Sequence, residues 1–167
     1  MYPANHSAAR LLALIAVRLL CFNPPSEAQV WKNIGPMPTG AGDSGRMTAV
    51  AVDPSDASHW LAGAATGGIF ESRDAGANWT PRTDGQPTLA SGAIAFAPGN
   101  PKIVYAGTGE SGFSGGSFAG LGLLKSVDGG TTWTLIQSPN LVRASVSAIR
   151  VHPSDPNTLV AATAQSG

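Results

Sequence analysis

Glu110 is the residue of this sequence that could most directly do chemistry. Two other segments match its surroundings and carry Thr66 and Gln165 at its position, so the repeated scaffold requires no carboxylate there. Hydrolysis of a glycosidic bond needs two carboxyl groups roughly 5 to 9.5 Å apart, and Glu110 could supply one of them. The simpler interpretation, which we favour, is that Glu110 organises its loop by bonding to backbone N–H groups or by pairing with Arg46.

Two further patterns that could do chemistry are weaker. Residues 107–112 fit the pattern G-x-G-x-x-G, but residues 113–116, Phe-Ser-Gly-Gly, cannot open the helix that a dinucleotide site needs. We expect His59, at a predicted turn, and His152, before a proline, to be solvated or locally bonded. Their separation gives no metal-binding spacing. The sequence therefore predicts neither a metal site nor a cofactor.

The pattern S-x-D-x-G-x-x-W occurs twice, at residues 72–79 and 126–133, and we call each copy an aspartate turn. Its aspartate can accept hydrogen bonds from backbone N–H groups, its glycine can adopt a positive φ, and its tryptophan can bury a large ring in the next strand. These properties describe a tight turn between two strands and require no substrate. The residues assigned to this scaffold are Ser72, Asp74, Gly76, Trp79, Ser126, Asp128, Gly130 and Trp133.

Each aspartate turn lies near the end of a longer repeat. The residue pattern of this repeat predicts four short strands. Segments 48–54, 92–98 and 147–153 align without gaps, alternate large and small apolar residues, and end at a proline. Such alternation predicts a first strand that is buried on both faces, with its small residues against a close neighbour. The remaining strands are predicted at 60–64, 104–108 and 159–163, then at 68–71 and 122–125, and from Trp79 and Trp133 onward, with an insertion at 112–120.

Repeats of four antiparallel strands predict an all-β chain and indicate a β-propeller. Residues 46–167 hold about two and a half blades, whereas a closed ring needs about four to eight. We therefore interpret the sequence as a fragment whose partners include the remaining blades of the same chain. Residues 29–45 are predicted to form an N-terminal strand that completes the last blade, followed by a linker.

Residues 1–28 resemble a secretory signal, with Arg10 before an apolar run and a cleavage site after Ala28. The apolar run is too short to span a bilayer. A buried N-terminal helix or a misassigned start is the alternative. Cys21, the only cysteine, lies in this leader, so the mature chain would contain no disulfide.

The composition agrees with a chain of strands and turns. The sequence contains 21 Gly and 13 Pro, which suits short strands joined by turns better than long helices. Ten Lys and Arg balance ten Asp and Glu, so the formal net charge is zero. This balance gives no electrostatic reason to expect nucleic acid or an anionic membrane as a partner.

Four segments, 31–36, 45–54, 105–111 and 125–133, resemble the N-terminal blades of secreted bacterial Asp-box (BNR) repeat propellers, a sortilin-like and glycosyl-hydrolase-like group. The resemblance covers nearly all of residues 31–167. It implies a propeller fold and a secreted, periplasmic or cell-surface location. It implies little about activity, because the same repeat occurs in sialidases, xyloglucanases and sortilin-like binding domains.

Strand direction separates the two ends of the predicted blades. The links between the second and third strands, and between the fourth strand and the next first strand, share one face, and the aspartate turns lie on the other. We call the first face the rim, and loops in such a position carry binding and catalysis more often than strands do. The residues predicted for the rim are Asp43, Arg46, Asp84, Glu110 and Arg143.

Two departures from enzymatic relatives bear on activity. The aromatic-Arg-Ile-Pro motif of sialidases is absent, and residues 65–68, Ala-Thr-Gly-Gly, stand where the resemblance to xyloglucanases implies an aspartate. We therefore expect an exported, non-catalytic scaffold whose rim binds an extracellular protein or glycan. The alternative is a sialidase-like or xyloglucanase-like glycoside hydrolase whose remaining catalytic residues lie beyond residue 167.

Overall fold

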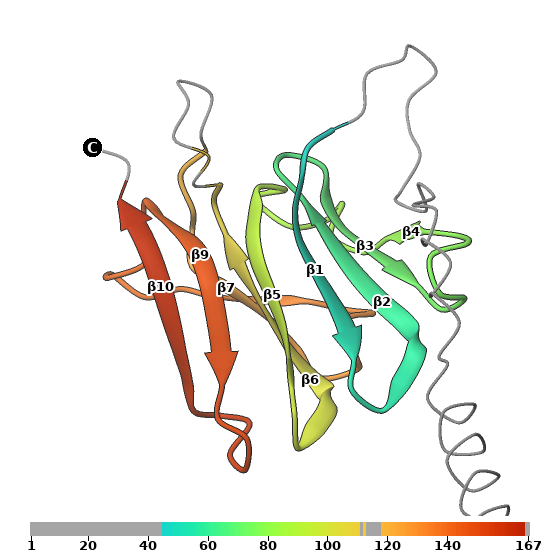
Figure 1. Cartoon of the computed structure of the whole chain (residues 1–167). Coiled ribbons are helices and arrows are strands. Elements are labelled where there is room, and N and C mark those ends of the chain that lie inside the picture. Colours follow the sequence, from blue (N-terminus) through green and yellow to red (C-terminus); the bar gives the residue numbers. More distant parts are fainter. Residues whose placement is uncertain (1–44, 111, 113–117, 166–167) are drawn as a thin grey trace, which may run out of the picture. The chain divides into compact units, whose positions relative to one another are not determined.

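The computed structural model describes residues 45–110, 112 and 118–165 (Figure 1). The chain divides into two units, Met1–Asn33 and Ile34–Gly167, and all described residues belong to the second. The predicted leader and nearly all of the predicted N-terminal strand and linker lie outside the described residues. In the described part, no helix is long and apolar enough to cross a membrane.

The described residues form two four-stranded antiparallel sheets and one antiparallel pair. We call these blade 1, blade 2 and blade 3, in chain order. Their strands are β1 (Met47–Asp53), β2 (Asp56–Ala64), β3 (Gly68–Ser72) and β4 (Thr80–Pro81), then β5 (Ser91–Ala97), β6 (Asn100–Thr108), β7 (Leu123–Ser126) and β8 (Thr134–Ile136), then β9 (Ala144–Val151) and β10 (Leu159–Gln165). The predicted all-β fold with four-stranded antiparallel sheets is confirmed.

The repeats fold in the same register. The large residue near the middle of each first strand faces an alanine of the second strand, in the pairs Val50–Ala62, Ile94–Ala106 and Ile149–Ala161. Because residues directly opposite each other share a face of the sheet, the sequence alternation becomes the same two-faced pattern in all three blades.

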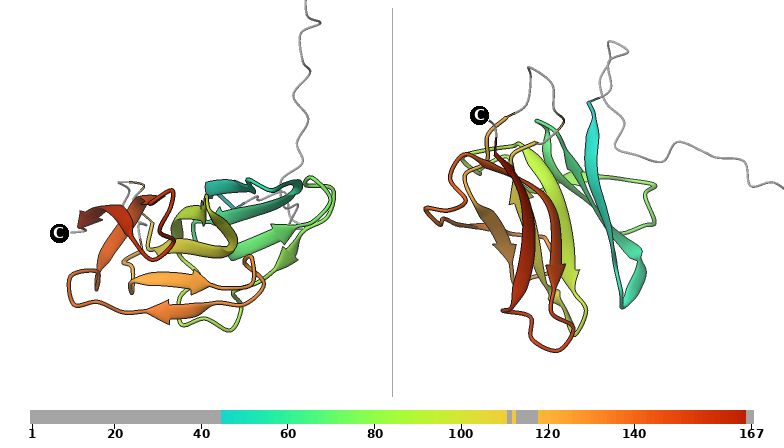
Figure 2. Two further views of the ribbon diagram at one scale, coloured as in Figure 1. Left: turned by 90° about the horizontal axis from the view of Figure 1, so that it is seen from below. Right: turned by 60° about the vertical axis from the view of Figure 1, so that its left-hand side comes forward.

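The blades stack side by side with their first strands adjacent (Figures 1 and 2). One apolar cluster, which includes Leu61 and Phe96, joins blade 1 to blade 2, and another, which includes Tyr105 and Ile149, joins blade 2 to blade 3. Gly107 makes the second contact close, since a Cβ at this position would overlap the Val146 side chain. A small residue of a second strand therefore lies where these two blades approach.

The prediction that all first strands are buried on both faces is wrong for β1. Val50 and Val52 are 68% and 49% exposed, whereas Phe96 at the position corresponding to Val52 is buried. Blade 2 has a neighbour on each side, but among the described residues blade 1 has a neighbour on one side only. The alternation of large and small residues determines which side chains share a face of the sheet. Whether that face is buried depends on whether a neighbouring blade packs against it.

The aspartate turns have almost identical hydrogen bonds. Asp74 Oδ1 accepts bonds from the Ser72 hydroxyl and the Asn78 backbone N–H, and Asp128 Oδ1 accepts the corresponding bonds from Ser126 and Thr132. The carboxylates thus hold their own turns. The indole groups differ, because Trp79 Nε1 donates to the Gly76 carbonyl, whereas buried Trp133 Nε1 has no hydrogen-bond partner among the described residues.

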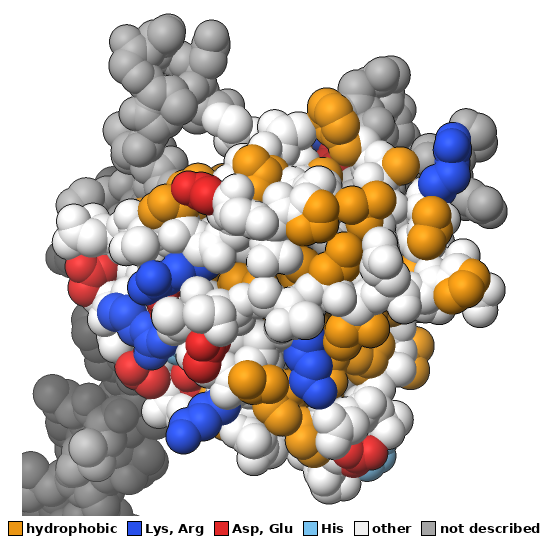
Figure 3. Space-filling view, turned by 180° about the vertical axis from the view of Figure 1, so that it is seen from behind, with side chains coloured by type: hydrophobic (Ala, Val, Ile, Leu, Met, Phe, Trp, Pro, Cys, Tyr) orange, Lys and Arg blue, Asp and Glu red, His pale blue; other side chains and the backbone are white. Residues whose placement is uncertain are grey.

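Charged and hydrophobic side chains are spread unevenly on the face seen from behind. Most of the Lys, Arg, Asp and Glu side chains in this view lie on its left, and most hydrophobic side chains lie in its centre and on its right, with charged groups among them (Figure 3). Charges of both signs are mixed on the left, so no large area of this face has a single sign. The mixing of positive and negative side chains on this face agrees with the formal net charge of zero.

Candidate functional site on the rim

The structure brings two of the predicted rim residues into direct contact. Arg46 lies just before β1 of blade 1, and Glu110 lies just after β6 of blade 2. The Arg46 Nη2 and Glu110 Oε1 atoms are 2.6 Å apart. The side chain of Arg46 is 53% exposed, but that of Glu110 is only 3% exposed. A residue predicted on a surface loop is therefore a buried carboxylate held by a cation from the neighbouring blade.

The backbone of Glu110 is fixed by two further bonds. Its N–H donates to the Phe118 carbonyl at 2.8 Å, and the hydroxyl of buried Ser145, in blade 3, donates to its carbonyl at 3.3 Å. Glu110 Oε2 is buried and has no hydrogen-bond partner among the described residues. A buried polar atom without a partner is costly, so this oxygen needs a partner that the described residues do not supply.

A cavity of about 240 Å³ adjoins the ion pair. Residues of all three first strands or their approaches line it, together with the start of the insertion: Arg46, Met47, Thr48, Gly92, Glu110, Gly112 and Ser147. Gly112 lies against the ion pair, because a Cβ at this position would overlap Glu110 Oε1. Among these lining residues Glu110 has the only carboxyl group, so the described cavity cannot by itself present the carboxyl pair that glycoside hydrolysis needs.

Of the other predicted rim residues, Asp84 and Arg143 do not line this cavity. Asp84 is exposed in the link between β4 and β5. Arg143 is exposed just before β9, has a positive φ of 68°, and donates its backbone N–H to the Gly120 carbonyl at 2.9 Å. Asp43 lies outside the described residues.

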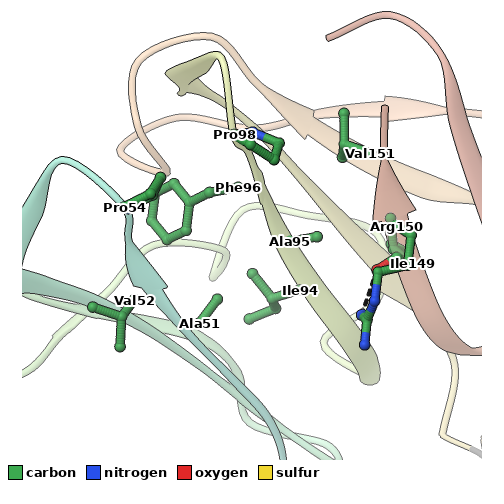
Figure 4. Close-up of a pocket in the computed structure, with 10 residues that line it drawn as sticks. All are labelled: Ala51, Val52, Pro54, Ile94, Ala95, Phe96, Pro98, Ile149, Arg150 and Val151. Carbon is green, nitrogen blue, oxygen red and sulfur yellow. Dashed lines mark hydrogen bonds between the residues drawn. The ribbon is translucent and has the colours of Figure 1, made fainter. Parts of the chain in front are cut away.

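A second hollow follows the inner strands and has a different character. It measures about 310 Å³, and its walls come from β1, β5, β9 and the prolines that follow β1 and β5 (Figure 4). Ile94 stands between Ala51 and Ile149 in this view. The only charged residue in its walls is Arg150, whose guanidinium donates to the carbonyl of Ile149. This hollow offers apolar contact and no group for acid–base chemistry.

Sequence reasoning missed a buried charged cluster at the opposite end of the blades. His59 was predicted at a turn, solvated or locally bonded. The turn and the solvation are wrong, because His59 lies within β2 and is 1% exposed, but it is bonded to a residue close in sequence. Its Nδ1 atom is 2.9 Å from Asp53 Oδ2. Its Nε2 atom is 3.0 Å from Glu71 Oε1, without hydrogen-bond geometry. Arg82 completes the cluster through two 2.7 Å contacts with Glu71 Oε2.

Two features of the sequence carry a signal for this cluster. Asp53 and Glu71 stand at strand positions where the pattern calls for a buried residue, and buried acids need partners. Burial alone would raise the pKa of Asp53, but hydrogen bonds with His59 and Ser55 outweigh it and hold that pKa below its ordinary value. Within the described ranges, no group of three or more His, Cys, Asp or Glu side chains is arranged to hold a metal ion.

Comparison with solved structures shows what these blades resemble. They resemble part of a GH74 propeller. The GH74 enzyme of Niastella koreensis matches with 26% sequence identity and a TM-score of 0.53, over 70% of this chain and 17% of that enzyme. An ancestral GH74 enzyme matches with 21% identity and the same TM-score, over 74% of this chain and 17% of its own. The chain thus spans about a sixth of the enzymes that it matches.

Comparison by sequence gives no family. No protein-family model matches the chain, and no curated protein matches it. The likeness to part of a GH74 glycoside hydrolase propeller therefore comes from the comparison of structures.

Proposed function

We propose that these blades belong to a carbohydrate-active propeller of the glycoside hydrolase type, and that the cavity beside Arg46 and Glu110 contacts a glycan. The likeness to the Niastella koreensis GH74 enzyme carries this proposal. It favours the hydrolase alternative over the non-catalytic scaffold that the sequence pattern favoured. The signal-like residues 1–28 agree with an exported protein, which would meet extracellular polysaccharides.

The chemistry of the cavity suits one ring of a polysaccharide. Its volume of about 240 Å³ lies below the roughly 300 to 1,000 Å³ typical of drug-sized ligand sites, so a single sugar unit of a longer chain is the fitting occupant. Arg46 lines the cavity, is half-exposed and can donate a hydrogen bond to a sugar hydroxyl while it keeps Glu110 in place.

Hydrolysis requires a second carboxyl group across the scissile bond. The described cavity provides Glu110 only. The proposal therefore assigns Glu110 to one half of a carboxyl pair and assigns the other half to a part of the protein outside the described residues.

A non-catalytic glycan-binding role is the second candidate, and two observations favour it. Residues 65–68, between the end of β2 and the start of β3, are Ala-Thr-Gly-Gly where the resemblance to xyloglucanases implies an aspartate. The ion pair with Arg46 also gives Glu110 a structural role that needs no reaction.

Binding and hydrolysis measured together separate the two candidates. A protein that carries the complete propeller, and its Glu110→Gln variant, would be titrated calorimetrically with soluble xyloglucan, mixed-linkage β-glucan and sialyllactose, and assayed for release of reducing ends. Release that Glu110→Gln abolishes supports the hydrolase. Binding without release, weakened by Glu110→Gln, supports the non-catalytic role. If the wild-type chain neither binds nor cleaves any of the three glycans, the proposal is wrong.

A further inference from the structure

His59 is a buried titratable residue at the contact between blade 1 and blade 2. Its ring meets the ring of Phe96, in blade 2, in a T-shaped arrangement with the centroids 5.3 Å apart. Gly129, in the aspartate turn of blade 2, is also close, because a Cβ at this position would lie 3.5 Å from His59 Cε1. A change in the charge of His59 therefore acts directly on the contact between the two blades.

The two ring nitrogens of His59 each face a carboxylate. Nδ1 is 2.9 Å from Asp53 Oδ2, and because the pKa of Asp53 lies below its ordinary value, this carboxylate is ionised and Nδ1 is the donor. Nε2 is 3.0 Å from Glu71 Oε1, and neither atom has a hydrogen-bond partner among the described residues. If the ring is neutral, Nε2 is an acceptor, so two buried acceptors face each other at a cost in energy.

The charges around the ring favour an additional proton. The carboxylates of Glu71 and Asp53 are 1% and 10% exposed, whereas the side chains of Arg82 and Arg73 are 30% and 54% exposed, so solvent screens the cations more than the carboxylates. The charged groups around His59 from both blades are four carboxylates and three cations, namely Asp53, Asp56, Glu71, Asp128, Arg73, Arg82 and Lys102. A proton on His59 brings this set to neutrality.

We propose that His59 is an acid-sensitive clasp between blade 1 and blade 2. A proton on Nε2 replaces the contact between two acceptors by an attraction between the imidazolium and Glu71, and fixes the ring against Phe96 and Gly129. Histidine is the side chain whose charge ordinarily changes between pH 5 and pH 8. Because the folded cluster favours the protonated ring and the unfolded chain does not, the clasp contributes in mildly acidic solution and its contribution is lost as the pH rises.

Backbone hydrogen exchange at the blade contact tests this proposal in a protein that carries the complete propeller. Exchange in β2 and in the second aspartate turn is compared between wild type and His59→Gln at pH 5.5 and at pH 8, each pair at the same pH. His59→Gln should speed this exchange about 3- to 10-fold at pH 5.5 and less than about 2-fold at pH 8, because the charged contact is lost only where the ring carries the proton. His152→Gln, at the exposed histidine of blade 3, is the matched control and should change neither value.

Two outcomes overturn the proposal. An effect of His59→Gln that is equal at both pH values would show that the ring acts by packing alone, and a larger effect at pH 8 would show that the neutral ring is the stabilising form. If His59→Gln does not fold, exchange of the hydrogen on the imidazole Cε1 in the wild type, which follows ring protonation, replaces the comparison. A His59 ring that stays protonated where His152 is neutral supports the clasp, and a His59 ring that loses its proton together with His152 or at a lower pH overturns it.

Discussion

Arg46 and Glu110 connect two blades through one ion pair, with the cation from the approach to β1 and the buried carboxylate from the end of β6. Blade 1 contains a related pair within a single repeat, where Arg73, just after β3, lies 2.5 Å from buried Glu71. The two arginines are almost equally exposed, at 53% and 54%. Their carboxylate partners differ, because Glu71 also contacts Arg82, whereas the described contacts of the Glu110 carboxylate include only one cation.

This difference predicts unequal losses of stability. Arg46→Ala leaves a buried carboxylate without a cation and is expected to lower the free energy of unfolding by about 2 kcal/mol. Arg73→Ala leaves Glu71 paired with Arg82 and should cost no more than about 1 kcal/mol. Urea denaturation of both variants measures the two losses. Adding Glu110→Gln to Arg46→Ala should recover part of the loss, and equal losses for the two single variants would contradict the assignment.

The sequence predicted those parts of the fold that depend on local residues. The aspartate turns and the strand periodicity need only neighbours within one repeat, so residues such as Asp74 and Asp128 could be assigned before the structure. The exposure of Val50 depends on whether another sheet covers it, and no local pattern contains that information.

The same limit explains what was missed in the candidate sites. Pairing of Arg46 with Glu110 was one of two alternatives, since strand direction placed both on the rim. The location of His59 between Asp53 and Glu71 was missed, because the prediction began the second strand at residue 60. The structure begins β2 at Asp56, and this four-residue extension turns a predicted turn residue into a buried one.

Gly107 provides a test of how closely the blades must approach. A Cβ at Gly107 would overlap the Val146 side chain of blade 3, so Gly107→Ala should cost about 1 to 3 kcal/mol through strain at the blade contact. Ala162 occupies the corresponding position of the third repeat and is exposed. Ala162→Val should therefore change stability by less than about 0.5 kcal/mol. Thermal unfolding compares the two variants, and a tolerated Gly107→Ala would mean that the blade contact is looser than described.

Asp128 predicts an acid-sensitive contribution to stability. Burial by itself would raise the pKa of Asp128, but hydrogen bonds from Thr132 and Ser126 lower it to about 2. A carboxyl group with a lowered pKa in the folded state stabilises the fold above its unfolded pKa, near pH 4, and loses this contribution as the pH falls to about 2.

The Asp128→Asn variant isolates that contribution. Because Asp128 is largely exposed, solvent screening reduces its effect, and the variant should lose about 1 kcal/mol at pH 7. The difference in unfolding free energy between wild type and variant should shrink between pH 4 and pH 2. Denaturation curves at pH 7, 4, 3 and 2 measure it. A difference that stays constant over this range would show that the carboxylate charge does not hold the turn.

The second aspartate turn contains two adjacent glycines that should respond differently to a methyl group. Gly129 and Gly130 have φ angles of 75° and 99°, in the left-handed region where a Cβ is unfavourable. A Cβ at Gly129 would meet its nearest neighbour, His59 Cε1, at an ordinary 3.5 Å, whereas a Cβ at Gly130 would lie 2.7 Å and 2.8 Å from the two terminal methyl groups of Leu61. Gly129→Ala should therefore cost about 1 kcal/mol from backbone conformation alone, and Gly130→Ala about 2 to 3 kcal/mol.

The first aspartate turn already carries Ala75, with a φ of 56°, at the position of Gly129, so Ala75→Gly is the matched control and should leave stability unchanged or raise it slightly. Chemical denaturation ranks the three variants, and a loss in Gly129→Ala as large as that in Gly130→Ala would show that the turn conformation, and not its packing against Leu61, limits the second position.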